Sequence, residues 1–286
     1  MASSVPETAA AAAPDVASFI TPEVTGVIRT SGKNNLLASE FAALMPPPPD
    51  CWTKLTDAIG AAYQLEISPV RTSYRSYYLI EGALPRDEVE ACLKAAFADL
   101  SPVTAERDGE LGVFHLGADV TVYAAWRGSI VIAGSKELVT RALRAGTPEV
   151  ARTWRERLSQ MPTGPMAMWR ADVLLASLSG ASPTNYIVTI DRIARAPRAF
   201  ISGRILARYG AAGDAAIAAR RLKQGELHLP DNGVTELADA FRHLKVSQAG
   251  TTLELAYDLD LVQRLVLGQL ELWLQLVADA APAARP

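Results

Sequence analysis

Long apolar runs, histidines and an excess of one charge are absent or scarce in this sequence of 286 residues. No window reaches the roughly 18 uninterrupted apolar residues typical of a membrane-spanning helix, so we expect no membrane span. The chain has 28 basic and 31 acidic residues, a formal net charge of -3. This balance gives no electrostatic reason to expect nucleic acid as a partner.

The first fifteen residues, MASSVPETAAAAAPD, contain no lysine or arginine. They therefore lack the charged start and apolar centre of a secretory signal. Two interpretations stay open at this point. The chain is a cytoplasmic protein with a flexible start, or it is an exported protein whose signal sequence has been removed.

Motifs for catalysis, metal binding and cofactor binding are also missing. The three histidines, His115, His228 and His243, are scattered along the chain. There is no GxSxG elbow, no GxGxxG or GxxxxGK[ST] phosphate loop, no HExxH and no EF-hand loop. We therefore predict no catalytic residue, metal ligand or cofactor.

The closest approach to a basic patch comes from arginines and a lysine in the second half. Arg204 and Arg208 lie on a predicted strand, and Arg220, Arg221 and Lys223 lie on the helix that follows. No aromatic stacking platform accompanies them in the sequence. A solvated helix face is therefore the favoured interpretation.

What the sequence does contain is an apparent internal repeat. Residues 24–39 read VTGVIRTSGKNNLLAS and residues 165–177 read PMAMWRADVLLAS, which share an apolar run, an arginine and Leu-Leu-Ala-Ser. We expect an α+β protein built by tandem duplication of a lobe, with an antiparallel sheet and helices packed on one face. The predicted divisions are a flexible tail at 1–18, repeats at 19–160 and 161–280, and a tail at 281–286.

Hydrophobic periodicity and turn residues predict the elements of both halves. In the first half they indicate strands at 24–30, 63–67, 77–84, 103–106, 111–116, 120–126 and 129–133, and helices at 36–45, 51–62, 85–100 and from 135 through 161, the last of them interrupted near Gly146 and Pro148. In the second half, 187–195 is expected to match the helix at 51–62, followed by a strand at 200–209, helices at 214–222 and 237–244, a hairpin of 245–248 with 252–257, and a last helix at 259–277.

Cys51 and Cys92 are the only cysteines, and each falls on a predicted helix of the first half. An even count on two helices that can lie side by side is compatible with a disulfide. Two unrelated buried thiols are an equally good interpretation, because free cysteine is among the most buried residue types.

The last predicted helix is apolar over well over half of its circumference, whereas a surface helix needs only one apolar stripe. The surplus has to be covered by the other lobe, a second copy, a different protein or an apolar ligand. We predict a partner-binding or self-association surface formed by Val266, Leu270, Trp273, Leu274 and Val277.

Three longer segments carry a resemblance to a known group of proteins. They read PPPPDCWTKLTDAIGAAYQLEIS, YYLIEGALPRDEVEACLKAAF and VTVYAAWRGSIVIAGSKELVTRAL. They resemble duplicated α+β proteins of myxobacteria and relatives that are often exported or lipid-anchored, in which a cysteine precedes the first helix and another lies in the helix after the second strand. The resemblance implies an oxidising compartment, a Cys51–Cys92 disulfide and a periplasmic or cell-envelope location, with the cytoplasm as the alternative.

The sequence thus supports three functional hypotheses. The leading one is a non-enzymatic binding or structural and assembly protein of the cell envelope. The second is a carrier of a lipid-like apolar ligand held between sheet and helices. The third is a hydrolase of unrecognised type, which would require a cleft lined by convergent titratable groups.

Overall fold

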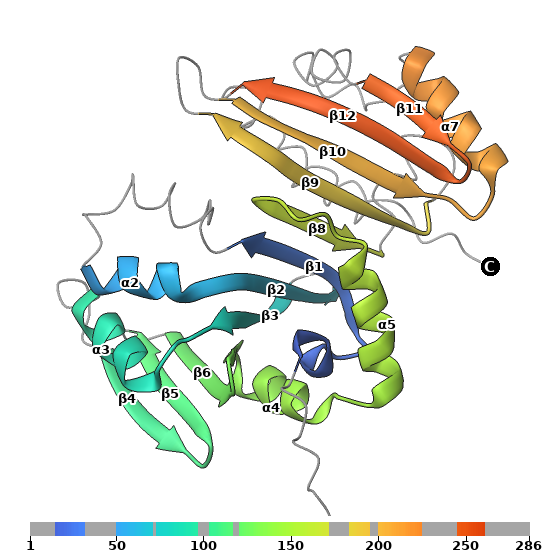
Figure 1. Ribbon diagram of the computed structural model, residues 1–286. Helices are drawn as coiled ribbons and strands as arrows, with labels where there is room; N and C mark the ends of the chain where they lie inside the picture. Colours follow the sequence, from blue (N-terminus) through green and yellow to red (C-terminus); the bar gives the residue numbers. More distant parts are fainter. Residues whose placement is uncertain are drawn as a thin grey trace, which may run out of the picture.

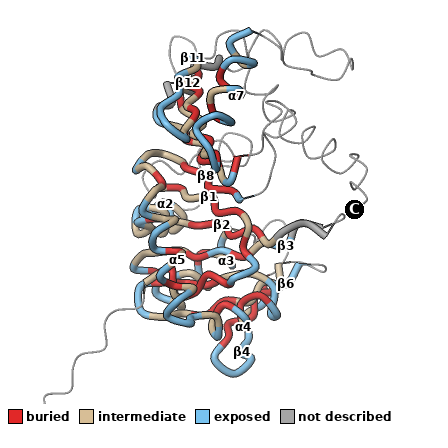
Figure 2. The backbone as a smooth tube through the Cα atoms, turned by 90° about the vertical axis from the view of Figure 1, so that its right-hand side faces the viewer, coloured by how far each residue is buried: buried red, intermediate tan, exposed pale blue. Residues whose placement is uncertain are grey.

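The computed structural model describes residues 15–31, 50–70, 73–96, 103–116, 120–171, 183–194, 200–224 and 245–260. Within them, the strands form one 12-stranded antiparallel sheet in the order β11-β12-β10-β9-β8-β1-β2-β3-β7-β6-β5-β4 (Figure 1). Figure 2 shows buried residues following the strands along the length of this sheet.

The strands are β1 (Val24–Ser31), β2 (Ile59–Val70), β3 (Ser73–Gly82), β4 (Val103–Asp108), β5 (Leu111–Leu116), β6 (Val120–Arg127), β7 (Ile130–Gly134), β8 (Met166–Arg170), β9 (Asn185–Ala194), β10 (Phe200–Arg208), β11 (Lys245–Ala249) and β12 (Thr252–Asp260). The described helices are η1 (Val16–Phe19), α2 (Asp50–Ala58), α3 (Arg86–Ala96), α4 (Lys136–Arg144), α5 (Pro148–Ser159) and α7 (Ala212–Gln224).

The antiparallel pair β1 and β8, in which Val27 lies opposite Trp169, divides the sheet into seven strands on one side and five on the other. We call β1–β7 the first wing and β8–β12 the second wing. From this pair the strands run outward as β1, β2, β3, β7 in the first wing and as β8, β9, β10, β12 in the second. The two wings therefore belong to one continuous sheet, and the expectation of a separate sheet in each lobe is not met.

Turn and cap residues explain several elements locally. Gly109, Gly128 and Gly250 have φ values of 63°, 61° and 56°, in the left-handed region that favours glycine, and they sit in the turns of the β4/β5, β6/β7 and β11/β12 hairpins. The Ser135 side chain accepts a hydrogen bond from the Leu138 N–H and caps α4. The predicted meander, the hairpin and this helix are confirmed.

Helices cover both faces of the first wing, which corrects the expectation of helices on one face. Successive side chains of a strand point to opposite faces. Leu79 packs in the first cluster, with η1, α4 and α5, whereas its neighbour Ile80 packs in another with α2 and α3. Both faces of β3 carry apolar residues, and exposing either face to water would be unfavourable. Helices are therefore needed on both sides of the sheet.

The second wing has one described helix, α7. Its Ala215 and Ala218 are fully buried in a cluster with Leu253 and Leu255 of β12. Residues that lie opposite each other on neighbouring strands share a face of the sheet. Following these partners from Leu255 of β12 to Ile28 of β1 leads to the face that α2 and α3 cover. The helix α7 therefore shares a face of the sheet with α2 and α3.

Two sequence predictions about element type were wrong. Residues 187–195 were expected to form a helix, but they belong largely to β9, which pairs with both β8 and β10. The run Ile187, Val188, Thr189 and Ile190 is β-branched throughout and suits a strand with neighbours on both sides. Leu259, expected to begin the last helix, lies in β12.

The helix predicted at 51–62 ends at Ala58, where β2 begins. The elements predicted at 36–45, at 237–244 and over most of 259–277 lie outside the described residues.

Candidate binding surface

The cysteine pair predicted from the sequence is joined. Cys51 of α2 and Cys92 of α3 form a disulfide with a Cα–Cα distance of 5.5 Å, in the usual range for such bonds. Cys92 is buried and Cys51 half-buried. The bond fastens α2 to α3 over the outer part of the first wing.

The predicted apolar interaction surface cannot be placed. Val266, Leu270, Trp273, Leu274 and Val277 all lie outside the described residues. Among the helices that the structure describes, none is long and apolar enough to cross a membrane.

His115 of β5 takes part in a surface contact. Its Nδ1 lies 3.1 Å from the Thr121 hydroxyl and its Nε2 lies 3.3 Å from Glu106 Oε1. In the described part of the chain, no group of three or more histidine, cysteine, aspartate or glutamate side chains is arranged to hold a metal. Both contacts of His115 lie on the exposed surface of the sheet.

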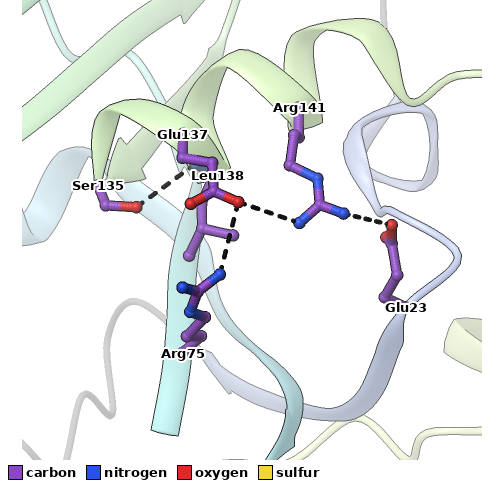
Figure 3. Close-up of polar contacts among 6 residues, drawn as sticks. All are labelled: Glu23, Arg75, Ser135, Glu137, Leu138 and Arg141. Carbon is purple, nitrogen blue, oxygen red and sulfur yellow. Dashed lines mark hydrogen bonds and ion pairs between the residues drawn. The ribbon is translucent and has the colours of Figure 1, made fainter. Parts of the chain in front are cut away.

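Exposed ion pairs tie α4 to its surroundings (Figure 3). Arg141 of α4 contacts Glu23 at 2.7 Å and Glu137 at 3.5 Å, and Glu137 also contacts Arg75 of β3 at 3.5 Å. The side chains in this network are all more than two-fifths exposed. Such exposed pairs each contribute little to the free energy of unfolding.

A buried ion pair lies where the wings meet. Arg170 of β8 and Glu66 of β2 lie on either side of Gly26 of β1, and Arg170 Nη1 is 3.2 Å from Glu66 Oε2. Their side chains are 3% and 11% exposed. A Cβ on Gly26 would stand 2.8 Å from Glu66 Oε2, so the absence of a side chain there leaves room for the pair. This pair links the first strand of the second wing to the first wing.

The second wing exposes one face of its sheet, opposite α7. We define the open face by residues of β9, β10, β11 and β12 whose side chains lie there: Asp191, Arg204, Lys245, Ser247 and Glu254. Arg204 lies 2.8 Å from Asp191 and 3.9 Å from Glu254. The hydrogen bond to Asp191 raises the pKa of Arg204 further above its usual value. All of these side chains are exposed or half-exposed.

Next to the open face, at the end of α5, an arginine stacks on aromatic rings. The Arg157 guanidinium lies 4.6 Å from the ring centre of Trp154 and 4.8 Å from that of Trp169. The two rings are 5.3 Å apart in an edge-to-face arrangement, which is favourable for aromatic pairs. Burial lowers the pKa of Arg157.

A second arginine approaches the same helix end from β10. Arg208 Nη1 donates a 2.7 Å hydrogen bond to the side-chain carbonyl of Gln160, one residue after α5. Asn185 lies opposite Arg208, and Trp169 lies opposite Ile187 in the adjacent row of the same face. We call Arg157, Gln160, Trp169, Asn185 and Arg208 the seam cluster.

Sequence reasoning missed the seam cluster and interpreted Arg208 as part of a solvated basic patch. The aromatic rings of the cluster belong to α5 and β8, about forty to fifty residues before Arg208 in the chain, and they stack on Arg157. The one local indication is the three-residue spacing of Trp154 and Arg157, which places both on the same side of a helix.

Comparisons with known proteins support the fold. No family model matches the chain, and no curated protein matches it. The solved structure described as "Structure of crystal form III of TP0453" is similar, with a TM-score of 0.52 and 10% identity over 87% of this chain and 95% of that chain. "Structure of crystal form IV of TP0453" gives a TM-score of 0.52 and 9% identity over 86% of this chain and 93% of that chain. At such identities the likeness shows the fold alone.

Proposed function

We propose that this protein is a non-enzymatic binding or structural and assembly protein of the cell envelope. The observation that carries the proposal is the Cys51–Cys92 disulfide, which uses both cysteines of the chain. Disulfides persist in oxidising compartments and are rare in the cytosol. The resemblance to exported proteins of myxobacteria and relatives supports the same location.

The open face supports a binding role. The side of the second wing that carries α7 is apolar and buried, whereas Arg204, Lys245 and Glu254 present charges on the other side. Both signs of charge occur there within neighbouring strands. Such a surface favours a partner with complementary charges, because rim and surface charges set specificity and association rate.

The C-terminal segment supplies a second, apolar surface in this proposal. From its sequence, Val266, Leu270, Trp273, Leu274 and Val277 would bind a protein partner or a second copy of the chain. Substitution of Leu270 and Trp273 by glutamate should abolish that association while leaving the disulfide and the far-UV circular dichroism unchanged. Unchanged association in the double variant would reject this surface.

We also infer that the two halves arose by duplication, with repeats at 19–160 and 161–280. The matching outward order of strands from β1 and from β8 supports this inference. So does the shared Leu-Leu-Ala-Ser segment that follows each of these strands by a few residues.

The location is tested in the organism that makes the protein. Cells are fractionated, and the protein in each fraction is denatured without reduction and treated with a thiol-labelling reagent. We expect it in the envelope or periplasmic fraction with no reactive thiol. Recovery in the cytosolic fraction with two reactive thiols would contradict the proposal.

The binding role is tested by photo-crosslinking inside the same cells. A photoreactive amino acid at Ser247, which is exposed on the open face, should give a discrete adduct with one partner. The matched control carries the same amino acid at Arg152, which is exposed on α5. No adduct at Ser247, or the same adducts at both positions, would argue against a partner on this face.

A further inference from the structure

The seam cluster brings two guanidinium groups to the end of one helix. Arg157 lies in the last turn of α5, and Arg208 contacts Gln160 immediately after it. Residues three apart on a helix are neighbours, at roughly 5–6 Å between Cβ atoms. Arg157 and Gln160, the residue that Arg208 contacts, are therefore neighbours at the end of α5.

The charge of this pair is not balanced by carboxylates among the described residues. Arg157 contacts the rings of Trp154 and Trp169, and Arg208 contacts the neutral amide of Gln160. The contrast is Arg204, on the same strand and face as Arg208, which has Asp191 and Glu254 beside it. Arg208 therefore lacks the carboxylate partners that Arg204 has on the same strand and face.

The cluster also contains a buried donor without a partner. Trp169 is 3% exposed, and its indole N–H has no hydrogen-bond partner within the described residues. The side-chain oxygen of Asn185 is also buried without a partner there, but it is an acceptor and would need a donor rather than an anion. A buried donor without a partner costs about 1–3 kcal/mol. A bound anion would offer the indole N–H an acceptor.

We infer that the seam cluster binds a phosphate group, most simply that of a phosphate monoester. Guanidinium groups bind phosphate through paired N–H donors in a fixed plane. Two guanidinium groups match the double negative charge of a monoester, whereas a carboxylate carries one. Stacking between Trp154 and Trp169 fixes the plane of Arg157 before a ligand arrives, which lowers the entropy cost of binding.

The test is a calorimetric titration of the full chain with glycerol 3-phosphate at constant ionic strength. We expect saturable binding to one site, and about tenfold weaker binding in Arg208→Gln. The matched control is Arg204→Gln, a change of the same type on the same strand and face, which should bind as the wild type does.

Arg157 is tested in two steps because its side chain also packs on tryptophans. Arg157→Lys keeps the positive charge and loses the planar fork, so we expect weaker binding with little loss of stability. Arg157→Gln should abolish the change in tryptophan fluorescence that phosphate induces in the wild type. If Arg157→Gln fails to fold, Arg208→Gln and Arg157→Lys still decide the question.

Several outcomes would overturn the inference. One is a folded wild type that shows no saturable binding at millimolar glycerol 3-phosphate or on vesicles containing phosphatidic acid. Another is equal weakening in Arg204→Gln and Arg208→Gln. A lower melting temperature in the arginine variants without any phosphate binding would show that the arginines only stabilise the helix end. Binding to the vesicles but not to glycerol 3-phosphate, lost in Arg208→Gln, would support a lipid phosphate as the source.

Discussion

The two wings share a sheet but differ in how it is covered. In the first wing, η1, α4 and α5 pack on one face and α2 and α3 on the other, and a disulfide joins α2 to α3. In the second wing, the described helix α7 packs on one face, and charged side chains occupy the opposite face. The same strand order can therefore support a covered core in one wing and an exposed surface in the other, depending on which side chains stand at alternate strand positions.

The continuous sheet couples these wings mechanically. The first cluster extends from η1 across β1 into Trp169 and Ile187 of the second wing. We therefore expect the described wings to unfold together, with the first cluster contributing most of the stability.

Trp154→Ala should cause the largest loss, roughly 4–5 kcal/mol of unfolding free energy. The ring is 1% exposed and packs on Trp169 and Arg157. The comparison is Leu255→Ala in the cluster under α7, for which we expect about 3 kcal/mol. Urea denaturation followed by fluorescence and by circular dichroism measures both.

Both variants should show a single transition by both probes. Two transitions within either variant would mean that the wings unfold independently. The inference that β1 and β8 couple the wings would then be wrong.

Replacing Cys51 and Cys92 by serine should lower the unfolding free energy by about 4 kcal/mol in the chain-entropy model, which depends on the loop length. The sequence separation of the two cysteines is 41. Because α2 has no buried residue, we expect α2 to be the element that detaches most easily from the sheet once the disulfide is lost.

Limited trypsin digestion of reduced and unreduced wild type measures this directly. Reduction should expose the bond after Lys54 of α2 and leave cleavage after Arg220 of α7 unchanged. Equal acceleration at both bonds would show that the disulfide stabilises the whole sheet rather than the cover of the first wing.

Arg170→Met should cost about 3 kcal/mol, because it leaves the buried Glu66 carboxylate without this guanidinium. The control is Arg75→Met, which removes one partner of the exposed pair with Glu137 and should change stability by about 0.5 kcal/mol or less. Adding Glu66→Gln to Arg170→Met should restore part of the loss. Similar losses in the two single variants would show that the junction pair is no more important than a surface pair.

The sequence predicted the outer hairpins well because glycine turns and alternating patterns are local. It did not predict that β9 is a strand, because the expected match to the Cys51 helix came from the repeat rather than from residues such as Ile187 and Val188. The sequence analysis also did not predict that helices cover both faces of the first wing. Whether Ile80 and Leu79 are both covered depends on helices distant in the sequence.

The candidate sites show the same limit. The Cys51–Cys92 pairing was correctly favoured, through a resemblance and through an even cysteine count. The seam cluster was not predicted, because Arg208 contacts its partners only when β8, β9 and β10 pair and α5 lies over them. Contacts of that kind are set by sheet register, which short sequence patterns do not specify.

Tyr77→Phe should lower the unfolding free energy by about 2 kcal/mol, with a distinct pH dependence. The Tyr77 hydroxyl donates a 2.9 Å hydrogen bond to the Phe19 carbonyl and accepts one of 3.0 Å from the Thr21 N–H, so its loss leaves two buried backbone groups without partners. Burial raises the pKa of Tyr77 to about 12. The unfolded chain therefore loses this proton first, near pH 10, and the stability from the protonated hydroxyl is lost as pH rises from about 10 to 12.

The second wing offers the matching variant. Burial also raises the pKa of Tyr257, whose hydroxyl donates a 2.6 Å hydrogen bond to the Thr189 carbonyl. Tyr77→Phe and Tyr257→Phe should each make the fall in unfolding free energy between pH 10 and 12 less steep, because each removes one group that titrates in the unfolded chain first. Urea midpoints measured at pH 8, 10 and 11 test this. If Tyr257→Phe leaves the slope unchanged while Tyr77→Phe reduces it, the second wing does not unfold in the same transition as the first.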